Sequence, residues 1–255
     1  MPRPYILAET NWKAVQETTY DLAVLPWGAT EAHNYHLPYA TDNIQNEFVA
    51  EAAARLAWQR GAKVILLPNI PFGINTGQLD IPLCINMNPE TQMQVLRDVA
   101  DSILRAGIRK LVIFNGHGGN HFKLMVRDLS FHFPNLFSCA INWFDGGGNW
   151  GDYFEDLGDH AGELETSTMM HIAPDLVMPL DTAGDGAVKS WKIQAMKDGW
   201  VTSQRQWTKV SADTGVGDPS KSTAENGQRF LEDCAEGIAK FWVDLAAVDV
   251  EDMYE

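Results

Sequence analysis

The segment "DLAVLPWGATEAHNYHLPYATDN", residues 21–43, joins a short apolar run to a polar loop that carries two histidines and two carboxylates. Its first eight residues are mostly apolar and end in Pro-Trp-Gly, a composition typical of a buried β-strand. The loop then contributes Glu31, His33, His36 and Asp42. Apolar residues beyond residue 43 recur at helical spacing, and Gly61 would close that helix. The segment therefore predicts a strand, a ligand-rich loop and a helix, which is one unit of an α/β fold.

The same order of strand, loop and helix repeats along the chain. Continuous apolar strands separated by amphipathic helices indicate a parallel sheet covered on both faces. Residues 181–220 are polar and show little periodicity, so we expect them to form a long excursion over the surface of a single domain spanning 1–255. Further strands are predicted at 62–73, 108–116 and 135–144, and further helices at 88–107, 121–133, 162–173 and about 221–246.

The composition of the chain argues against nucleic acid and membranes as binding partners. The formal net charge of −15 leaves no excess of Lys and Arg to displace counterions from nucleic acid or to bind an anionic membrane. Cys84, Cys139 and Cys234 are odd in number and widely spaced, so they predict neither a disulfide framework nor a metal motif. Neither a signal peptide nor a membrane span is visible, and we expect a cytoplasmic location.

Polar clusters directly follow three of the predicted strands. Because the carboxyl ends of parallel strands meet at one edge of a sheet, we expect these clusters to lie together. Carboxylate oxygens mixed with imidazole nitrogens suit zinc, manganese or iron. Besides the loop at 21–43, the clusters are His117 and Asn120 in "NGHGGNH", and His160, Glu163 and Glu165 in "DHAGELETS".

Each cluster also has a plainer interpretation. Asp42 would serve as a helix N-cap as well as a bridge between two cations. The glycines of "NGHGGN" resemble a phosphate-binding loop, but the third glycine of G-x-G-x-x-G and the Walker lysine are missing. His36 is suited to an outer position that orients a ligand. Trp143, Trp150 and Trp191 fall where loops would close over a site.

Together, these motifs resemble the creatininase (creatinine amidohydrolase) family. That family shows G-[AS]-x-E-x-H…H-x-P…x-D, then N-G-H-G-G-N after a strand, then H-A-G-E-x-E-T-S. Here the segments read "GATEAHNYHLPYATD", "NGHGGN" and "HAGELETS", in the same order. The resemblance implies a flavodoxin-like three-layer α/β sandwich with a mostly parallel sheet, a dinuclear metal centre and a homo-oligomer, commonly a hexamer. It also implies that Glu31 and His117 hold one metal, His33 the other and Asp42 both, with His160 as the catalytic histidine.

The chain departs from creatininase itself after the third strand. Creatininase carries a tyrosine and an acidic residue one and two positions after the strand-three histidine, where this chain has Gly118 and Gly119. The resemblance therefore points to the H-A-G-E branch rather than to creatininase. In that branch, Glu163 would supply the missing carboxylate as a metal ligand. His36, Asn120 and Glu165 would support the ligands or contact substrate.

The implied activity is that of a metal-dependent amidohydrolase with a small-molecule substrate. Two divalent ions, zinc, manganese or iron, would activate a water that cleaves a C–N bond other than a peptide bond, in a cyclic or formyl amide. Branch relatives include deformylases, a peptide-trimming enzyme and a hydrolase that opens an oxidised inositol ring. A ring-opening C–C hydrolase of a cyclic polyol ketone is therefore the first alternative. A metal- or nucleotide-binding protein without turnover is the second.

Overall fold

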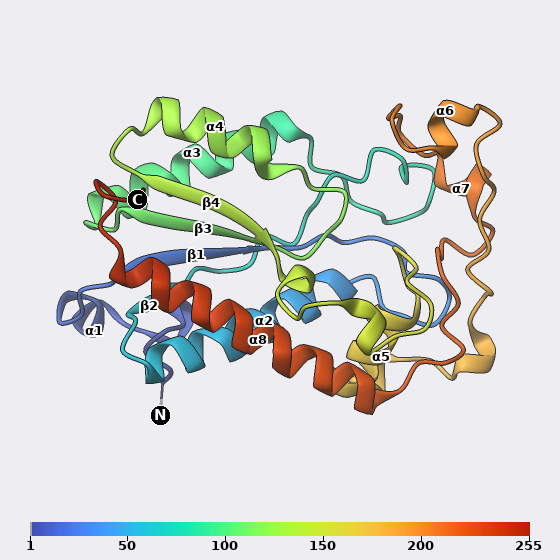
Figure 1. The fold of residues 1–255 in the computed structure, drawn as a ribbon, viewed down its shortest axis with the longest axis horizontal. Coiled ribbons are helices and arrows are strands. Elements are labelled where there is room, and N and C mark those ends of the chain that lie inside the picture. Colours follow the sequence, from blue (N-terminus) through green and yellow to red (C-terminus); the bar gives the residue numbers. More distant parts are fainter. Residues whose placement is uncertain (1) are drawn as a thin grey trace.

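A computed structural model describes residues 2–255 and shows a central sheet of four parallel strands in the order β2-β1-β3-β4 (Figure 1). The register pairs Val24 of β1 with Leu66 of β2 and with Val112 of β3. The strands are β1 (Leu22–Trp27), β2 (Val64–Leu66), β3 (Lys110–Asn115) and β4 (Phe137–Asn142). The predicted α/β class with a parallel sheet is confirmed.

Helices cover both faces of the sheet, because alternate residues of each strand point to opposite sides. Leu22 and Val24 pack in one core with α2 (Thr41–Gln59) and α8 (Ala224–Ala247). Ala23 and Leu25 pack in a second core with α3 (Pro89–Arg105) and α4 (Phe122–His132). Figure 1 shows these two helical layers on either side of the strands. The molecule therefore has the three-layer architecture of the flavodoxin-like sandwich.

Local sequence signals set several helix ends. Gly61 and Gly107 follow α2 and α3 with φ of +99° and +84°, a backbone conformation that glycine adopts without steric cost. The Thr223 hydroxyl accepts a hydrogen bond from Asn226 N and caps the start of α8. The other helical elements are η1 (Leu7–Glu9), α1 (Trp12–Gln16), η2 (Trp143–Asp145), η3 (Trp150–Asp152), α5 (Glu163–Ile172), η4 (Pro174–Leu176), η5 (Leu180–Thr182), α6 (Gln194–Lys197) and α7 (Trp207–Val210).

The second strand is shorter than the apolar run at 62–73 predicts. It ends at Leu66, because Pro68 and Pro71 have no N–H with which to continue the ladder. Ile70 still donates to Pro26 O at 2.9 Å, so the chain runs beside β1 before it leaves the sheet. The irregular connection that follows carries residues 74–78 to the carboxyl ends of the strands.

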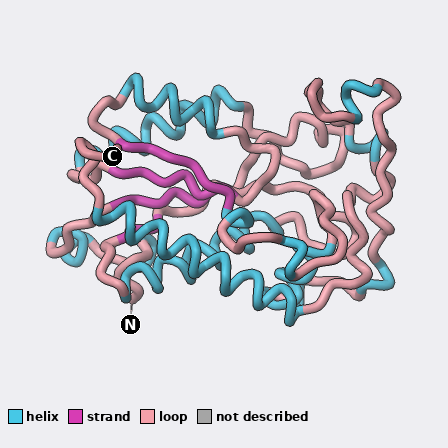
Figure 2. The backbone as a smooth tube through the Cα atoms, in the orientation of Figure 1, coloured by secondary structure: helices cyan, strands magenta, loops and turns pink. Residues whose placement is uncertain are grey.

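Residues 181–220 form mostly irregular structure with three short helical turns (Figure 2). Figure 1 shows α6 and α7 at the end of the molecule toward which the strands point. Asn34 exchanges hydrogen bonds with Gly184 at 2.8 and 3.1 Å, and Trp207 N donates to Gly77 O at 3.0 Å. The excursion is thereby attached to the loops that follow the sheet. None of the helices within residues 2–255 has the length and apolar character that crossing a membrane requires.

Candidate metal centre

The candidate centre lies where the loops after β1 and β3 separate. The connection from β1 leads into α2 on one face of the sheet, whereas the connection from β3 leads into α4 on the other. Such a divergence opens a crevice at the carboxyl ends of neighbouring strands. Glu31, His33 and Asp42 enter this crevice from the first loop and the first turn of α2, and each is at most 2% exposed. His117 enters from the loop after β3.

Main-chain carbonyls orient the three histidine rings. His33 Nδ1 lies 3.1 Å from Glu31 O, His117 Nε2 lies 3.1 Å from Ile74 O, and His160 Nε2 lies 2.8 Å from Ala32 O. Since a carbonyl oxygen only accepts, we assign the N–H of each ring to the nitrogen that faces it. In the neutral rings the opposite nitrogens would carry the lone pairs, and these nitrogens point toward the carboxylates, which is the arrangement of ligating histidines.

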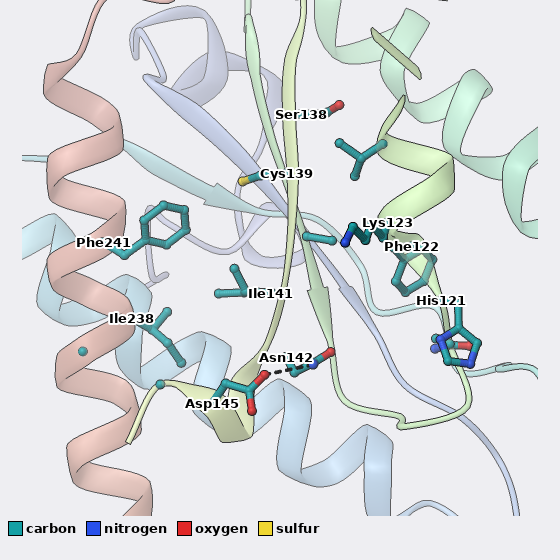
Figure 3. A pocket seen from close by; sticks show the side chains of 15 residues that line it. His121, Phe122, Lys123, Ser138, Cys139, Ile141, Asn142, Asp145, Ile238 and Phe241 are labelled. Carbon is teal, nitrogen blue, oxygen red and sulfur yellow. Dashed lines mark hydrogen bonds between the residues drawn. The ribbon is translucent and has the colours of Figure 1, made fainter. Parts of the chain in front are cut away.

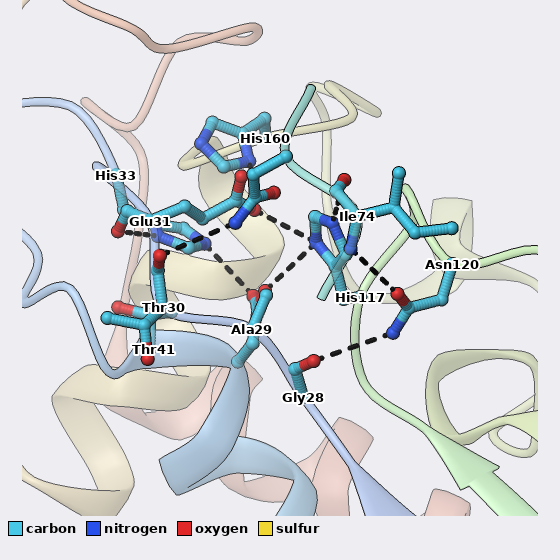
Figure 4. A network of polar contacts seen from close by, with 12 residues as sticks. Gly28, Ala29, Thr30, Glu31, His33, Thr41, Ile74, His117, Asn120 and His160 are labelled. Atoms are coloured by element: carbon cyan, nitrogen blue, oxygen red, sulfur yellow. Dashed lines mark hydrogen bonds and ion pairs between the residues drawn. The ribbon is translucent and has the colours of Figure 1, made fainter. Parts of the chain in front are cut away.

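Asp42 lies between two sets of potential ligands. Figure 4 shows that Glu31, His33, His117 and His160 lie close together in this crevice. Its Oδ1 is 3.0 Å from His33 Nε2, and its Oδ2 is 3.1 Å from His117 Nδ1. The His117 nitrogen is also 2.9 Å from Glu31 Oε1, and the His33 nitrogen is 3.8 Å from Glu165 Oε1. The ligand atoms of Glu31, Asp42 and His117 lie within 4.8 Å of one another, as do those of His33, Asp42 and Glu165. One carboxylate is therefore shared by two triads.

The buried polar groups of the two triads are better satisfied by a bound divalent cation than by hydrogen bonds among themselves. Asp42 Oδ2 is buried without a hydrogen bond of acceptable geometry, although it lies close to His117. A buried carboxylate oxygen left in this way is costly unless a cation takes the position. The ligand atoms of Glu31, His33 and His160 also lie within 4.8 Å of one another. The structure accordingly supplies donor sets of mixed oxygen and nitrogen, the chemistry that zinc and manganese accept.

The pKa values of these groups show how strongly they are coupled. Burial alone would lower the pKa of His33, but the carboxylates of Asp42 and Glu165 raise it to about 10. Burial likewise opposes a charged His117, yet Glu31 and Asp42 raise its pKa well above the ordinary value. Burial would raise the pKa of Asp42, and the two histidines hold it well below its usual range. Buried carboxylates in this centre thus require positive charge beside them.

The structure places the carboxylate of Glu165, and not that of Glu163, beside His33. Glu163 Oε2 accepts hydrogen bonds from the N–H groups of Glu155 and Asp156 at 2.8 and 2.9 Å. Glu165 accepts from Ala161 N and turns its other oxygen toward His33. Two residues separated by two positions on α5 point in different directions, because each helical residue rotates by about 100°. The structure therefore places Glu165, rather than Glu163, among the groups that could hold a cation.

The remaining candidate residues support the loops. His36 Nε2 lies 2.8 Å from Thr166 Oγ1, and burial lowers the pKa of His36 to about 4, so the ring stays neutral beneath the site. Asn120 Oδ1 accepts from Ile74 N and Gln92 Nε2, and the Asn120 amide nitrogen donates to Asn115 Oδ1. Asn120 thus holds two loops together beside His117.

Glycines in the loop after β3 serve packing around the ligands. A Cβ at Gly119 would overlap the ring of His117 and lie 2.7 Å from Ile74 O, whereas a Cβ at Gly118 would meet nothing within 4 Å. A Cβ at Gly116 would lie 2.8 Å from the Asn46 side chain. Gly119 therefore cannot be replaced by an acidic ligand in this conformation.

Asp42 lies in the first turn of α2 with Ala40 at the N-cap, so Asp42 is not the helix cap.

A cavity of about 400 Å³ opens onto the triads. The excursion at 181–220 supplies its roof through Ser203, Gln204, Arg205 and Trp207. The centre of the Trp207 ring lies 4.7 Å from that of His160. No sequence signal marked Trp207. Of the tryptophans that were expected to close a site, Trp143 is buried in the core and Trp150 packs against Phe144.

Larger hollows are not lined by the residues of the two triads. One of about 750 Å³ is formed by α4, β4 and α8 beside Ile141 and Phe241 (Figure 3). Its Asn142 side chain donates to Asp145 at 3.0 Å, so these two polar groups satisfy each other. The size of a cavity therefore does not identify the reactive site here; the donor groups do.

Comparisons with known proteins agree with the fold and identify the family. The family model "Creatininase: Creatinine amidohydrolase" matches residues 8–242. A mycofactocin precursor peptide peptidase from Mycobacterium ulcerans (strain Agy99) is 28% identical over 243 residues, covering 91% of this chain and 90% of the relative. A creatinine amidohydrolase from Pseudomonas putida is 24% identical over 269 residues, covering 94% and 96%.

Two solved structures show the same architecture. A candidate creatinine amidohydrolase from Bacteroides fragilis NCTC 9343 is 41% identical, covers 100% of both chains and superposes with a TM-score of 0.91. A creatininase variant in a zinc–zinc form is 23% identical, covers 94% of this chain and 97% of that chain, and has a TM-score of 0.74. Because the family model spans most of the sequence, the chain belongs to the creatininase family.

Proposed function

We propose that this protein is a metal-dependent hydrolase that holds two divalent cations, zinc or manganese, in the two triads. Glu31, Asp42 and His117 would hold one cation, and His33, Asp42 and Glu165 the other. The observation that carries the proposal is the position of Asp42, whose two buried oxygens each face a nitrogen of a different histidine. A family relative in a zinc–zinc form supports the choice of metal and its number.

Bound cations would supply a water of lowered pKa at neutral pH and a Lewis acid for the substrate carbonyl. A side chain of the protein would transfer the proton of the attacking water. His160 donates its Nε2 hydrogen to Ala32 O, which leaves Nδ1 free to accept the proton of the attacking water and to pass it to the departing atom. The His160 Nδ1 lies 3.8 Å from Glu31 Oε1, beside the first triad. Trp207 covers the same ring and limits the access of bulk water.

The bond that we propose is a C–N bond of a small amide, cyclic or formyl. The names of two relatives, a peptide peptidase and a creatinine amidohydrolase, both denote hydrolysis of a C–N bond, and only the second denotes an amide other than a peptide bond. In this reaction the His160 proton goes to nitrogen. Ring opening of a cyclic polyol ketone would deliver it to carbon, and a panel of lactams, formamides and cyclic polyol ketones separates the two reactions.

Metal content and turnover of matched variants test the proposal. After loading with zinc and dialysis, we expect two ions per chain in the wild type and in Glu163→Gln, but about one in Glu165→Gln. His160→Ala should keep both ions and lose activity by about a hundredfold or more. Metal is measured by inductively coupled plasma mass spectrometry, and activity on the substrate panel.

Three results would contradict parts of the proposal. A wild-type protein that retains no metal would rule out the dinuclear centre. An E163Q variant that loses one ion while E165Q keeps two would return the ligand role to Glu163. Full activity of the His160→Ala variant would remove His160 from proton transfer.

A further inference from the structure

The roof of the cavity carries positive charge in an otherwise acidic protein. Residues 189–209 hold five of the chain's 19 basic residues and one acidic residue, Asp198. Among these basic residues, Arg205 alone lines the cavity above the triads. Arg205 also lines a second hollow of about 380 Å³, together with Lys189, Lys192 and Lys209. Arg205 therefore lies between the metal centre and a basic hollow.

Arg205 is held in place by its surroundings. Its guanidinium carbon lies 4.7 Å from the centre of the Trp207 ring, and its Nη1 lies 3.1 Å from Asp159 Oδ2. A Cβ at Gly77 would overlap Arg205 O, so this glycine lets the two backbones approach closely. The Arg205 side chain remains 35% exposed. A fixed guanidinium with donors to spare is suited to bidentate binding of a carboxylate or phosphate.

We propose that the substrate is an amide with an anionic group, a carboxylate or phosphate, which Arg205 binds while the amide carbonyl lies at the metal centre. This inference rests on the proposed function and adds the substrate class. The three lysines of the adjoining hollow raise the local concentration of such substrates against the overall negative charge. Arg205 would be a specificity-determining residue, because an uncharged amide of the same shape leaves its donors unused.

The test uses hydroxamates that attach to zinc and carry tails of different length. The probes are the monohydroxamates of succinate, glutarate and adipate, each compared with the matching terminal carboxamide. Binding to the zinc-loaded protein is measured by isothermal titration calorimetry. At one tail length we expect the carboxylate to bind about tenfold more tightly than the carboxamide. A phosphonate-tailed probe of that length tells which of the two anions fits better.

Variants assign the preference to Arg205. The preference should fall to near unity in Arg205→Gln and be partly retained in Arg205→Lys. It should persist in Lys197→Gln, which removes an exposed charge on α6 that lines neither hollow. Asp159→Asn removes the internal partner of Arg205 and should increase the preference. This last variant changes an exposed side chain, so it remains informative if Arg205→Gln melts early.

Equal binding of both tails at every length in the wild type would overturn the inference. An unchanged preference in Arg205→Gln, or a reduced one in Asp159→Asn, would overturn it as well. Failure of the proposed function looks different, because a protein without zinc would bind neither the charged nor the neutral hydroxamates.

Discussion

Gly119 lies at a position where a side chain would clash, so the carboxylate near His33 has to come from another part of the chain. Its α-carbon lies so close to the His117 ring that no Cβ fits. A carboxylate ligand at position 119 is therefore excluded in this conformation. Glu165 approaches His33 from α5 on the opposite side of the crevice. The second triad is thus completed from a different element, with the same type of donor.

Replacing Gly119 with alanine should displace the His117 ring and weaken zinc binding by about tenfold to a hundredfold, as expected when the support of a ligand is lost. Gly118→Ala is the matched control, since a Cβ there meets nothing within 4 Å. Zinc affinity is measured by competition with a chelator. Equal affinities of the two variants would show that His117 does not depend on this contact.

The sequence could predict most of the candidate ligands but not all of them. Glu31, His33, Asp42 and His117 follow apolar strands directly, so the topology of a parallel sheet is enough to bring them to one edge. Glu165 could not be separated from Glu163 in this way. The direction that each takes depends on the rotation of α5, which packing against α8 and α2 determines.

Helices α5 and α8 approach each other closely at Gly227. A Cβ at Gly227 of α8 would overlap Ser167 O and lie 2.7 Å from Thr168 N of α5. Because α5 also carries Glu165, this contact places a ligand as well as a helix. The sequence predicted both helices, but not that a glycine would let them approach.

Gly227→Ala should destabilise the protein by about 1–3 kcal/mol through overpacking, although alanine favours a helix over glycine by about 1 kcal/mol. Lys240→Ala, an exposed change on the same helix, should leave stability nearly unchanged. Unfolding in urea gives both values. A Gly227→Ala protein as stable as the wild type would show that the helices can separate without cost.

Ion pairs of Arg3 connect η1 to α2. Arg3 donates to Glu9 of η1 at 3.0 Å and also pairs with Glu51 of α2. Hydrogen bonds from Arg3 lower the pKa of Glu9 from 4.5 to about 2. A folded-state pKa below the unfolded value means that Glu9 stabilises the fold above pH 4.5, and that this contribution is lost as the pH falls toward 2.

Glu9→Gln should therefore lower the melting temperature at pH 7, and the difference from the wild type should shrink between pH 5 and pH 3. Glu17→Gln, an exposed change nearby, is the control. Melting is followed by circular dichroism. A difference that stays constant over this range would show that the carboxylate of Glu9 contributes no charge-dependent stability.

At the scale of the whole molecule, the centre joins parts of the chain that are distant in sequence. Residues 31–42, 117 and 165 belong to three separate parts of the chain, and residues 203–205 and 207 of the excursion close over them. Sequence patterns predicted the sheet and its helices because burial gives strands and helices distinct periods. They could not predict the path of 181–220, which has little periodicity and is positioned by side-chain contacts such as those of Asn34. The expected hexamer and cytoplasmic location stay predictions.

Zinc should raise the thermal stability of the protein, because it binds the folded chain and few of its ligands are adjacent in the unfolded one. A free concentration about a hundredfold above the dissociation constant adds about 2.7 kcal/mol, which corresponds to roughly 5–10 °C for a chain of this size. Asp42→Asn should abolish the shift. The measurement is a melting curve with zinc and with chelator, and identical curves for the wild type would contradict it.

The three carbonyl oxygens that fix the tautomers of His33, His117 and His160 belong to the peptide chain itself. No point substitution can delete a peptide oxygen, so proton positions at this centre are protected against most mutations nearby. Wall residues such as Gly118 or Arg205 have no part in that arrangement. New substrates can therefore arise within this architecture by exchanging the walls, while the orientation of the imidazole rings is inherited unchanged.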